Sequence, residues 1–332
     1  MTNSPGSRSD TSKAGKWEPE RLRGKPFLAW IVAAGFFRGF LLVSLIPTSV
    51  GVALAFGETG VFHWLLFLAT LGGVWFYHLG GNLLNEYYDD YSGTDRINKV
   101  RTPFSGGTHA LQSGAIKPGL VFATAWAALV AGLVIFVALA LRVSDLVLVF
   151  AAIGLLSPIL YSVPPFWLSY HGYGEILIGL TFGPAVVLAA FFIQTKGITL
   201  EAALLGVCLG CAAAAIITIN EFPDAEADAD SDKKTLVVQL GPEKAFWIYA
   251  VVLIAGPAIA VLGAAAGLFP VGMLAHLLLL AWAARVALRS ERNYRSLPAL
   301  VLTCRNTILF LIAFWIVTLA AYLLPLAWKA SA

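Results

Sequence analysis

Charged residues are scarce in this sequence. Asp, Glu, Lys and Arg make up 12% of its 332 residues and 59% are hydrophobic, whereas a soluble domain carries roughly 25% charged and about 45–50% apolar residues. So few charges cannot cover a water-soluble globule, which argues strongly against a soluble enzyme. The three cysteines lie in or beside apolar runs, without histidine at metal-binding spacing, so neither a disulfide framework nor a Cys/His metal site is expected. The formal net charge of +3 gives no indication of a nucleic-acid partner.

Long apolar runs are abundant instead, and short polar stretches separate them. Each run has about 20 residues, the length that an α-helix needs to cross a bilayer with its backbone hydrogen bonds satisfied. The sequence therefore predicts an all-α, polytopic membrane protein with about nine transmembrane helices. Their expected ranges are 38–57, 61–84, 119–141, 145–162, 173–195, 202–219, 246–266, 269–288 and 306–328.

The N-terminal segment differs from the rest because it is rich in Ser, Gly, Lys and Arg. This composition predicts a disordered basic tail over residues 1–25, and no short apolar core with a cleavage site follows it, so a signal peptide is not expected. Residues 26–332 are expected to form one membrane domain. Arg38 interrupts its first apolar stretch, so residues 27–37 are expected to lie along the membrane surface.

Lys and Arg are distributed unevenly between the two ends of the expected helices. The side with the N-terminal tail and the loops after the second, fourth, sixth and eighth spans carries 18 of the 22 basic residues, and the opposite side carries three. Because positive charge is retained on the cytoplasmic side of membrane proteins, we expect the N-terminus and these loops in the cytoplasm and the C-terminus outside.

The acidic residues are clustered even more strongly. Ten of the 19 Asp and Glu residues fall in residues 85–95 and 220–232, at the expected cytoplasmic ends of apolar helices. NEYYDDYSGTD at 85–95 aligns without gaps on NEFPDAEADAD at 220–230, sharing Asn, Glu, an aromatic residue and two Asp positions. This repeat indicates two similar halves whose helix ends face each other across a shared cavity. We call 85–95 the first acidic segment and 220–230 the second.

Oxygen-bearing side chains recur every four residues in both acidic segments, which places them on one face of a helix. Two facing sets of such ligands suit Mg²⁺, which binds carboxylates, water and substrate phosphates. A metal held there can neutralise the charge of a departing diphosphate. The side chains are Asn85 and Asp89 in the first segment, and Asn220, Asp224 and Asp228 in the second.

Basic residues follow each acidic segment and can take the remaining phosphate oxygens. An anionic leaving group at the cytoplasmic surface, with an apolar cavity behind it, describes a lipid diphosphate as the substrate. The basic residues are Lys99, Arg101, Lys233 and Lys234. The alternative, that acidic loops are solvated turns, is the interpretation we prefer for Glu226, Asp230 and Asp232.

The two acidic segments and their flanks also match a known pattern. NLLNEYYDDYSGTD at 82–95 and NEFPDAEADADSDKKTLVVQLG at 220–241 are similar to the two Asp-rich motifs of the UbiA superfamily of intramembrane prenyltransferases. The long gap between Asp89 and Asp95 resembles the MenA-like branch of that family. One departure is Glu86, because an Asp is common at that position.

Two further stretches carry the same resemblance. YSVPPFWLSYHGYGEILIGLTFGP at 161–184 is similar to the loop and helix that precede a Phe-Gly-Pro in the MenA-like branch, and RGFLLVSLIPTSVGVALAF at 38–56 is similar to its first span. The resemblance covers residues 38 to about 320. It implies a nine-helix bundle around a central cavity open to the lipid, with Mg²⁺ and an isoprenyl diphosphate at the cytoplasmic end.

The resemblance also implies roles for individual residues. Mg²⁺ and diphosphate would be held by Asn85, Asp89, Asp95, Asn220, Asp224 and Asp228. Lys234 would support the diphosphate, with Lys99 or Arg101 as further candidates. The family reaction is ionisation to an allylic cation that a nucleophilic acceptor captures, so Asp89 and Asp224 are the expected catalytic aspartates.

Three other polar residues are candidates for the acceptor end of the site. Glu175 enters the membrane at the start of the fifth span, where an ionisable group is costly, so acceptor binding or proton handling is weighed against capping a helix N-terminus. Tyr161 and Asn82 are expected to contact substrate, although Asn82 alternatively bonds its neighbours. His63, His78 and His276 form no metal pattern and are expected to be structural.

The most specific expectation is transfer of an isoprenyl group to 1,4-dihydroxy-2-naphthoate in menaquinone biosynthesis, in the cytoplasmic membrane of a bacterium or archaeon. Other acceptors stay open, namely 4-hydroxybenzoate, a chlorophyll-type ring or a glycerol ether lipid. A divalent-cation transporter is the competing class, but the acids lie at helix ends and not at mid-membrane. Prenyl length and oligomeric state are left open.

Overall fold

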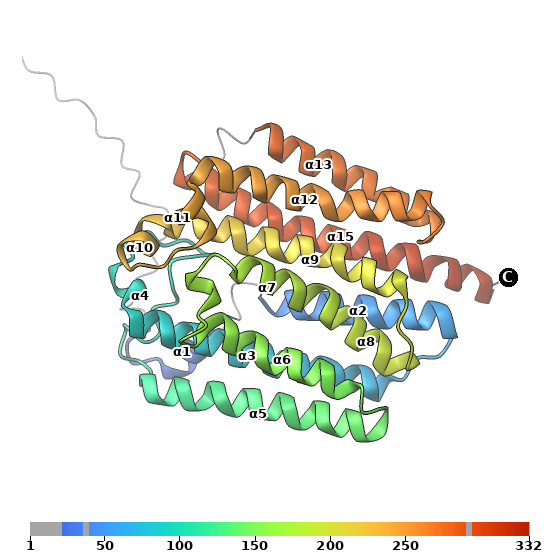
Figure 1. Cartoon of the computed structure of the whole chain (residues 1–332), viewed down its shortest axis with the longest axis horizontal. Helices are drawn as coiled ribbons and strands as arrows, with labels where there is room; N and C mark the ends of the chain where they lie inside the picture. The colour runs from blue at the N-terminus through green and yellow to red at the C-terminus, as the bar shows by residue number, and fades with distance from the viewer. Residues whose placement is uncertain (1–21, 36–39, 290–293, 332) are drawn as a thin grey trace, which may run out of the picture.

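The structure is a computed structural model that describes residues 22–35, 40–289 and 294–331. The predicted basic tail over 1–25 lies outside the described residues except for its last four, and Arg38 lies outside them as well. Long helices run side by side along the longest axis of the molecule, and short helices and loops gather at one end (Figure 1). We call this end the loop end.

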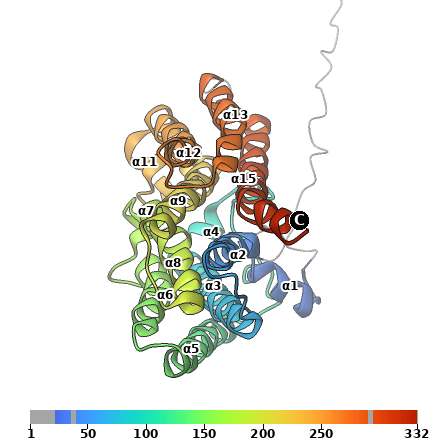
Figure 2. The ribbon, with the colours of Figure 1, turned by 90° about the vertical axis from the view of Figure 1, so that its right-hand side faces the viewer.

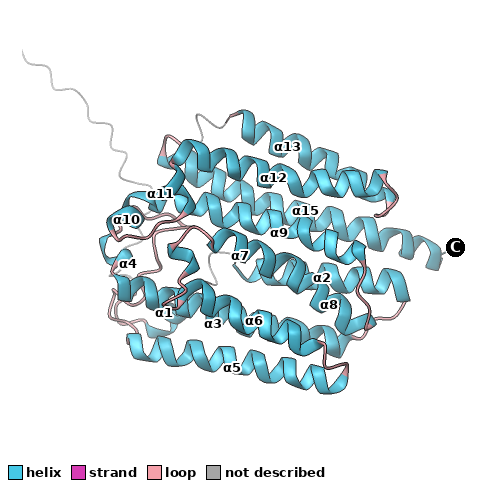
Figure 3. Cartoon of the chain, in the orientation of Figure 1, coloured by secondary structure: helices cyan, strands magenta, loops and turns pink. Residues whose placement is uncertain are grey.

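The architecture is all-α, and no β-strand occurs in the described parts of the chain (Figure 3). This confirms the predicted fold class. The helices are α1 (Pro26–Ala33), α2 (Phe40–Thr59), α3 (Trp64–Ser92), α4 (Thr94–Ile97), α5 (Pro118–Arg142), α6 (Val147–Ser162), α7 (Gly174–Leu180), α8 (Val186–Thr195), α9 (Leu200–Glu221), α10 (Ala225–Asp230), α11 (Leu236–Leu240), α12 (Pro242–Ala265), α13 (His276–Leu288) and α15 (Leu297–Ser331).

Within the described residues, eight helical segments are long and apolar enough to cross a membrane, and α6 is a shorter apolar helix. Each of the nine predicted spans has a counterpart among them, so the prediction of a polytopic bundle is confirmed. The boundaries differ where the acidic segments begin. α3 continues to Ser92, so most of the first acidic segment forms the last turns of a helix and not a loop.

Two hydrophobic cores hold the bundle together, and α8 contributes to both. One core joins α2, α8, α9, α12, α13 and α15, with Phe191, Phe246 and Phe314 fully buried in it. The other joins α1, α3, α5, α6 and α8 around Leu83 and Leu129. Viewed along the bundle, α13 and α5 lie at opposite sides, and α2, α3 and α8 lie between them (Figure 2).

The fifth predicted span is a single helical rod with a local distortion. α7 passes into α8 through one turn of π-helix at Thr181–Ala185, which contains Pro184. Proline has no N–H to continue the hydrogen-bond ladder, and a π-turn accommodates this loss by widening the helix locally. The distortion presents Thr181 and Phe182 to an internal cavity.

Glycines let this distorted span approach α9 closely. Gly179 and Gly183 are spaced four apart, as are Gly206 and Gly210, and the two pairs face each other. A Cβ atom on Gly210 would lie 2.5 Å from the carbonyl oxygen of Gly179, and one on Gly183 would lie 2.5 Å from Gly210 Cα. Small residues at this spacing are how membrane helices bring their backbones together.

We expect Gly210→Ala to destabilise the protein by about 1–3 kcal/mol, because the added methyl group meets backbone that cannot move without separating two helices. Gly72→Ala on α3 is the matched control, since a Cβ there meets nothing within 4 Å and alanine favours the helix by up to about 1 kcal/mol. Thermal unfolding of both variants in detergent measures the difference. Equal Tm values for the two variants would contradict the close approach.

Candidate active site

The two acidic segments meet at the loop end of the bundle. α3 ends at Ser92, where Gly93 takes the left-handed conformation (φ 88°) that terminates a helix. α9 ends at Glu221, and Pro223 turns the chain through a short 3₁₀ turn into α10. The Thr94 hydroxyl, in the first acidic segment, donates to the Ser231 hydroxyl, directly after the second, at 2.9 Å. The predicted facing of the two helix ends is therefore observed.

Asp89 has three polar partners from three parts of the chain. Asn85 donates from Nδ2 to its Oδ2 at 3.2 Å, one helical turn earlier on α3. The Tyr170 hydroxyl, from the connection between α6 and α7, donates to its Oδ1 at 2.8 Å. Lys233, which follows the second acidic segment, approaches Oδ2 at 3.2 Å. Asp89 is thus oriented by residues of both halves and of the connection between them.

Lys233 bridges the two acidic segments. Its ammonium lies 3.2 Å from Asp89 Oδ2 and 3.8 Å from Asp228 Oδ1, and all three side chains are at most 14% exposed. Burial alone lowers the pKa of Lys233, but the carboxylates of Asp89 and Asp228 outweigh it and raise this pKa well above the usual value. The lysine therefore stays charged and offsets the repulsion between two carboxylates.

Asp224 is held by the loop that follows the first acidic segment. Asn98 Nδ2 donates to Asp224 Oδ1 at 2.9 Å, and the Gly106 backbone N–H donates to Oδ2 at 3.0 Å. Asn98 is fixed in turn, because its Oδ1 accepts the N–H of Val100 at 2.9 Å. The arrangement is reciprocal: Asp89 of the first half is held by Lys233 of the second, and Asp224 of the second half by Asn98 of the first.

The donor set fits Mg²⁺. Every candidate ligand offers a carboxylate or amide oxygen, the hard ligands that Mg²⁺ prefers. Asn220 is buried, and no donor among the described residues reaches its Oδ1, which leaves this oxygen for a ligand. Within the described ranges, no three Asp, Glu, His or Cys side chains are grouped closely enough to hold a metal by themselves. Mg²⁺ commonly uses one or two carboxylates and completes its shell with water and substrate phosphates.

Asp95 and Glu86 are buried acids that contact the loop after α4. Asp95 is buried in α4, and its carboxylate lies directly against the backbone of Gly107. Glu86 is also buried, and it accepts a short hydrogen bond from the Thr108 hydroxyl. Both acids contact the loop that supplies Asn98 to Asp224. The metal role assigned to Asp95 from the family pattern stays a prediction.

The four predicted basic residues separate into two groups. Lys233 contacts the acids, whereas Lys99 is exposed and Lys234 is 62% exposed with its ammonium 3.8 Å from Asp232. Arg101 lines a separate cavity of about 410 Å³ together with Asp90, Arg96, His109, Leu111, Gln112 and Pro118. In that cavity Arg96 is paired with Asp90 at 3.0 Å, and burial lowers the pKa of Arg101 although the nearby Asp95 carboxylate opposes this. The structure therefore brings Lys233 to the acids.

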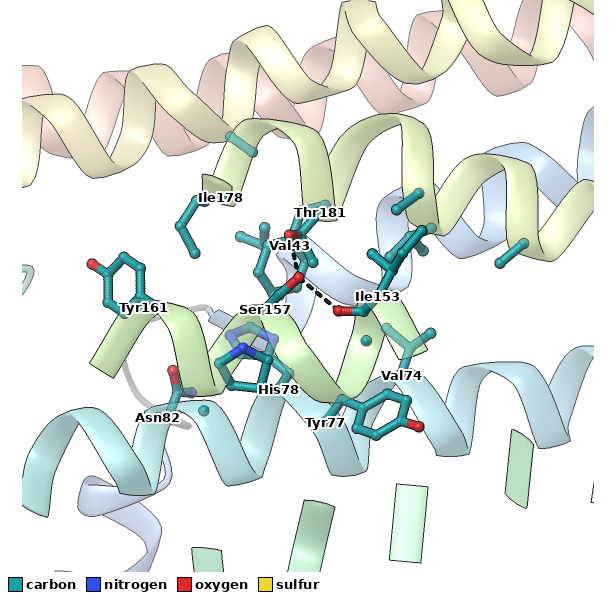
Figure 4. A pocket seen from close by; sticks show the side chains of 18 of the residues that line it. Val43, Val74, Tyr77, His78, Asn82, Ile153, Ser157, Tyr161, Ile178 and Thr181 are labelled. Atoms are coloured by element: carbon teal, nitrogen blue, oxygen red, sulfur yellow. Dashed lines mark hydrogen bonds between the residues drawn. The ribbon is translucent and has the colours of Figure 1, made fainter. Parts of the chain in front are cut away.

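An apolar cavity of about 170 Å³ lies next to the acidic site (Figure 4). α2, α3, α5, α6, α7, α8 and α9 contribute its walls, together with the π-turn. Asn82 and Asn85 from α3 and Tyr161 from α6 belong to its lining. Because Asn85 also bonds Asp89, one side chain joins the cavity to the acidic site.

Several polar groups in the cavity wall are satisfied by their neighbours. Thr181 donates to Ser157 at 2.9 Å, and Ser157 donates to the Ile153 carbonyl at 2.7 Å (Figure 4). Asn82 donates to the Ala34 carbonyl at 3.1 Å. This contact matches the alternative in which Asn82 bonds its neighbours. It lines the cavity as well.

His78 lines the cavity from α3, and the structural role expected for it stays a prediction. Its Nδ1 is 2.6 Å from the Ser44 hydroxyl, and its ring contacts Phe182 at 4.7 Å between centroids. A lone histidine in an apolar run carries no pattern by which the sequence alone could reveal this placement.

Glu175 takes the capping role that was weighed for it, but on a different helix. Its Oε1 accepts the N–H of Leu236 at 3.2 Å, in the first turn of α11, and its carboxyl group interacts with that of Glu221. Glu175 is not one of the described residues that line the 170 Å³ cavity. Its contacts attach α7 to the chain after the second acidic segment, and its role towards the acceptor stays a prediction.

Tyr170 and Asn98 are site residues that the sequence did not indicate. Tyr170 bonds Asp89, and Asn98 bonds Asp224. Both lie in connections whose fold depends on tertiary contacts, so no helical period marks them. The available signal was indirect: each lies within ten or so residues of a predicted motif or substrate residue.

Comparison with known proteins places these features in a family. Residues 44–302 match the UbiA prenyltransferase family. The chain is 30% identical over 210 residues, 63% of its length, to the 1,4-dihydroxy-2-naphthoate octaprenyltransferase of Bacillus subtilis, and the match spans 66% of that protein, just under two thirds. It is 26% identical over 264 residues, 79% of its length, to the 2-carboxy-1,4-naphthoquinone phytyltransferase of Synechocystis, and the match spans 83% of that protein.

The fold is similar to a solved structure of a UbiA homolog from Archaeoglobus fulgidus bound to DMAPP and Mg²⁺. The TM-score is 0.59 at 16% identity, and the superposition covers 86% of this chain and 98% of the other. At this identity the likeness concerns the fold. It agrees with the predicted helical membrane bundle.

We expect Lys233→Met to lower the free energy of unfolding by about 3 kcal/mol in metal-free buffer, because it leaves two buried carboxylates without their cation. Lys234→Met is the matched control, since an exposed pair contributes at most about 1 kcal/mol. Thermal unfolding in detergent with EDTA compares them. A Tm for Lys233→Met equal to that of Lys234→Met would show that Lys233 does not hold the two acidic segments together.

Proposed function

We propose that this chain, which belongs to the UbiA prenyltransferase family, is a membrane enzyme that transfers an isoprenyl group from a polyprenyl diphosphate to an aromatic acceptor, with Mg²⁺ bound at the two acidic segments. Membership in this family sets aside the divalent-cation transporter. The observation that carries the proposal is the position of Asn85, which lines the apolar cavity and bonds Asp89. A prenyl chain in the cavity would place its diphosphate against the acids.

The residues of the acidic site have separate roles in this proposal. Mg²⁺ would be held by Asn85, Asp89, Asp95, Asn220, Asp224 and Asp228, the set given by the family pattern. When bound, it would supply positive charge that stabilises the diphosphate as it leaves. Lys233 adds a fixed positive charge between the two segments and would move part of its bonding from carboxylate to phosphate oxygens.

The proposed reaction breaks two bonds and forms one. The bond between C1 of the prenyl chain and the diphosphate oxygen breaks, and its electron pair leaves with the diphosphate. The remaining allylic cation would lie in the cavity near Asn85, where aromatic rings of Tyr161 and Phe182 belong to the lining and can stabilise a cation. A nucleophilic carbon of the acceptor ring then bonds to C1, and the ring loses a proton, or carbon dioxide where that carbon carries a carboxylate.

We propose 1,4-dihydroxy-2-naphthoate as the acceptor, which would place the chain in menaquinone biosynthesis. The names of the Bacillus subtilis and Synechocystis relatives both specify a naphthalene-derived acid as the acceptor, and the first acidic segment has the spacing of the MenA-like branch. Another aromatic acceptor or a glycerol ether lipid is the alternative. An aromatic acceptor presents an activated ring carbon and a glycerol ether lipid does not, so measuring transfer to a series of acceptors distinguishes these alternatives.

We infer that the loop end of the bundle faces the cytoplasm. The loops on that side carry most of the Lys and Arg residues, and positive charge is retained on the cytoplasmic side. Diphosphate substrates made in the cytoplasm would then reach the acidic site directly. The prenyl chain would enter the cavity from the lipid.

The proposed reaction predicts acceptor-dependent release of diphosphate. Purified protein in detergent with Mg²⁺ and a labelled polyprenyl diphosphate should release diphosphate and form a prenylated product when 1,4-dihydroxy-2-naphthoate is added. EDTA should stop the reaction. Release with 4-hydroxybenzoate or glycerol ether lipid alone would assign a different acceptor, and no release with any acceptor would overturn the proposed function.

Loss of either central aspartate charge should abolish turnover. We expect Asp89→Asn and Asp224→Asn each to lower kcat by at least about 100-fold, the usual cost of removing one element that stabilises a charged transition state. Asp230→Asn is the matched control, because this exposed residue of the second acidic segment is expected to be solvated. Folding is checked by Tm and size-exclusion chromatography. Substantial activity in both central variants would contradict the site assignment.

A further inference from the structure

Tyr170 lies outside both acidic segments but contacts the first of them and the chain that directly follows the second. It belongs to a 3₁₀ turn, Leu168–Tyr170, in the connection between α6 and α7, and it is only 6% exposed. Its hydroxyl and its ring have different partners. This division allows the two parts of the side chain to be tested separately.

The hydroxyl of Tyr170 reaches the first acidic segment. It donates to Asp89 Oδ1 at 2.8 Å, and the hydroxyls of Ser92 and Thr94 lie 2.6 and 3.1 Å from it. An ionised carboxylate can only accept a hydrogen bond, so the Tyr170 phenol is the donor in its contact with Asp89. One Asp89 oxygen is thereby fixed, while the other faces Asn85 and Lys233.

The ring and backbone of Tyr170 reach the chain after the second acidic segment. The Lys233 ammonium lies 5.0 Å from the ring centroid, within the range of a cation–π interaction. The Tyr170 carbonyl accepts the N–H of Lys234 at 3.0 Å. Trp167, three residues earlier in the same connection, stacks on Tyr170 with 4.2 Å between the ring centroids. The ring is therefore held in place and supports Lys233.

We propose that Tyr170 is a positioning residue that sets the carboxylate of Asp89 for the metal through its hydroxyl and the ammonium of Lys233 for the diphosphate through its ring. The inference rests on the metal and diphosphate roles proposed above. It adds a third segment, the connection between α6 and α7, to a site otherwise built from two. The hydroxyl acts on metal binding, and the ring acts on diphosphate binding.

Two substitutions separate these effects. Tyr170→Phe removes the hydroxyl and keeps the ring, so we expect the Mg²⁺ concentration for half-maximal activity to rise about tenfold, the effect of losing one hydrogen bond to a charged group. The KM for polyprenyl diphosphate should stay within about twofold, since the cation–π contact remains. Tyr170→Leu removes both contacts, so both quantities should rise. Tyr173→Phe is the matched control, because Tyr173 lies in the same connection and is 58% exposed.

Metal binding is also measured without turnover. Mn²⁺ titrations followed by electron paramagnetic resonance, with an unreactive prenyl thiolodiphosphate bound, should show about tenfold weaker binding to Tyr170→Phe than to wild type or Tyr173→Phe. Unchanged Mn²⁺ affinity and Mg²⁺ dependence in Tyr170→Phe would overturn the proposal. Equal rises in the Mg²⁺ requirement and the diphosphate KM of Tyr170→Phe, with a lowered Tm, would overturn it in favour of a purely structural role.

The same titration distinguishes failure of this inference from failure of the proposed function. Wild-type protein that binds Mn²⁺ and thiolodiphosphate, with Tyr170→Phe unchanged, would reject the role of Tyr170 and leave the function standing. Wild-type protein that binds neither probe would reject both. Weaker Mn²⁺ binding in Tyr170→Phe supports the positioning role even where the natural acceptor differs from the one proposed.

Discussion

The site depends on the compensation of negative charge at the end of an apolar bundle. Asp89 and Asp228 are 139 residues apart in the sequence, and both are buried, so their carboxylates would repel each other across a poorly solvated space. Lys233 lies between them at 3.2 and 3.8 Å. The single ammonium of Lys233 thus lets the two acidic segments approach. The hydrogen bonds from Tyr170 to Asp89 and from Asn98 to Asp224 fix two of the aspartates of the site.

The central aspartate of each acidic segment is held by residues that follow the other segment. Asp224 is held by Asn98 and the Gly106 N–H, which follow the first segment, whereas Asp89 is held by Lys233, which follows the second. Each half therefore orients the aspartate of the other. This explains why the chain keeps two similar motifs: neither aspartate is positioned by its own half alone.

Much of the fold was predictable because a bilayer leaves few choices. Apolar runs of helical length gave the spans, and the matched acidic segments gave the helix ends that meet. The exact helix limits were not predictable at α3, since polar side chains there continue the helix to Ser92 and find partners only in the folded site. Tyr170 and Asn98 were missed as site residues, and the position of His78 in the cavity wall was not predicted, for a related reason. Their placement depends on contacts between segments distant in sequence, which periodicity and spacing do not encode.

The boundary between charged site and apolar cavity lies within a short stretch of α3. His78 and Asn82 line the cavity, Asn85 lies at its edge, and Asp89 belongs to the acidic site. These positions are three or four residues apart, so one face of a single helix leads from the apolar wall to the carboxylates. An allylic cation must be kept from water, while its diphosphate must be kept near positive charge. A helix that changes polarity along one face meets both requirements over about two to three turns, which is why the chemistry of such a site belongs at the end of a membrane helix and not in its middle.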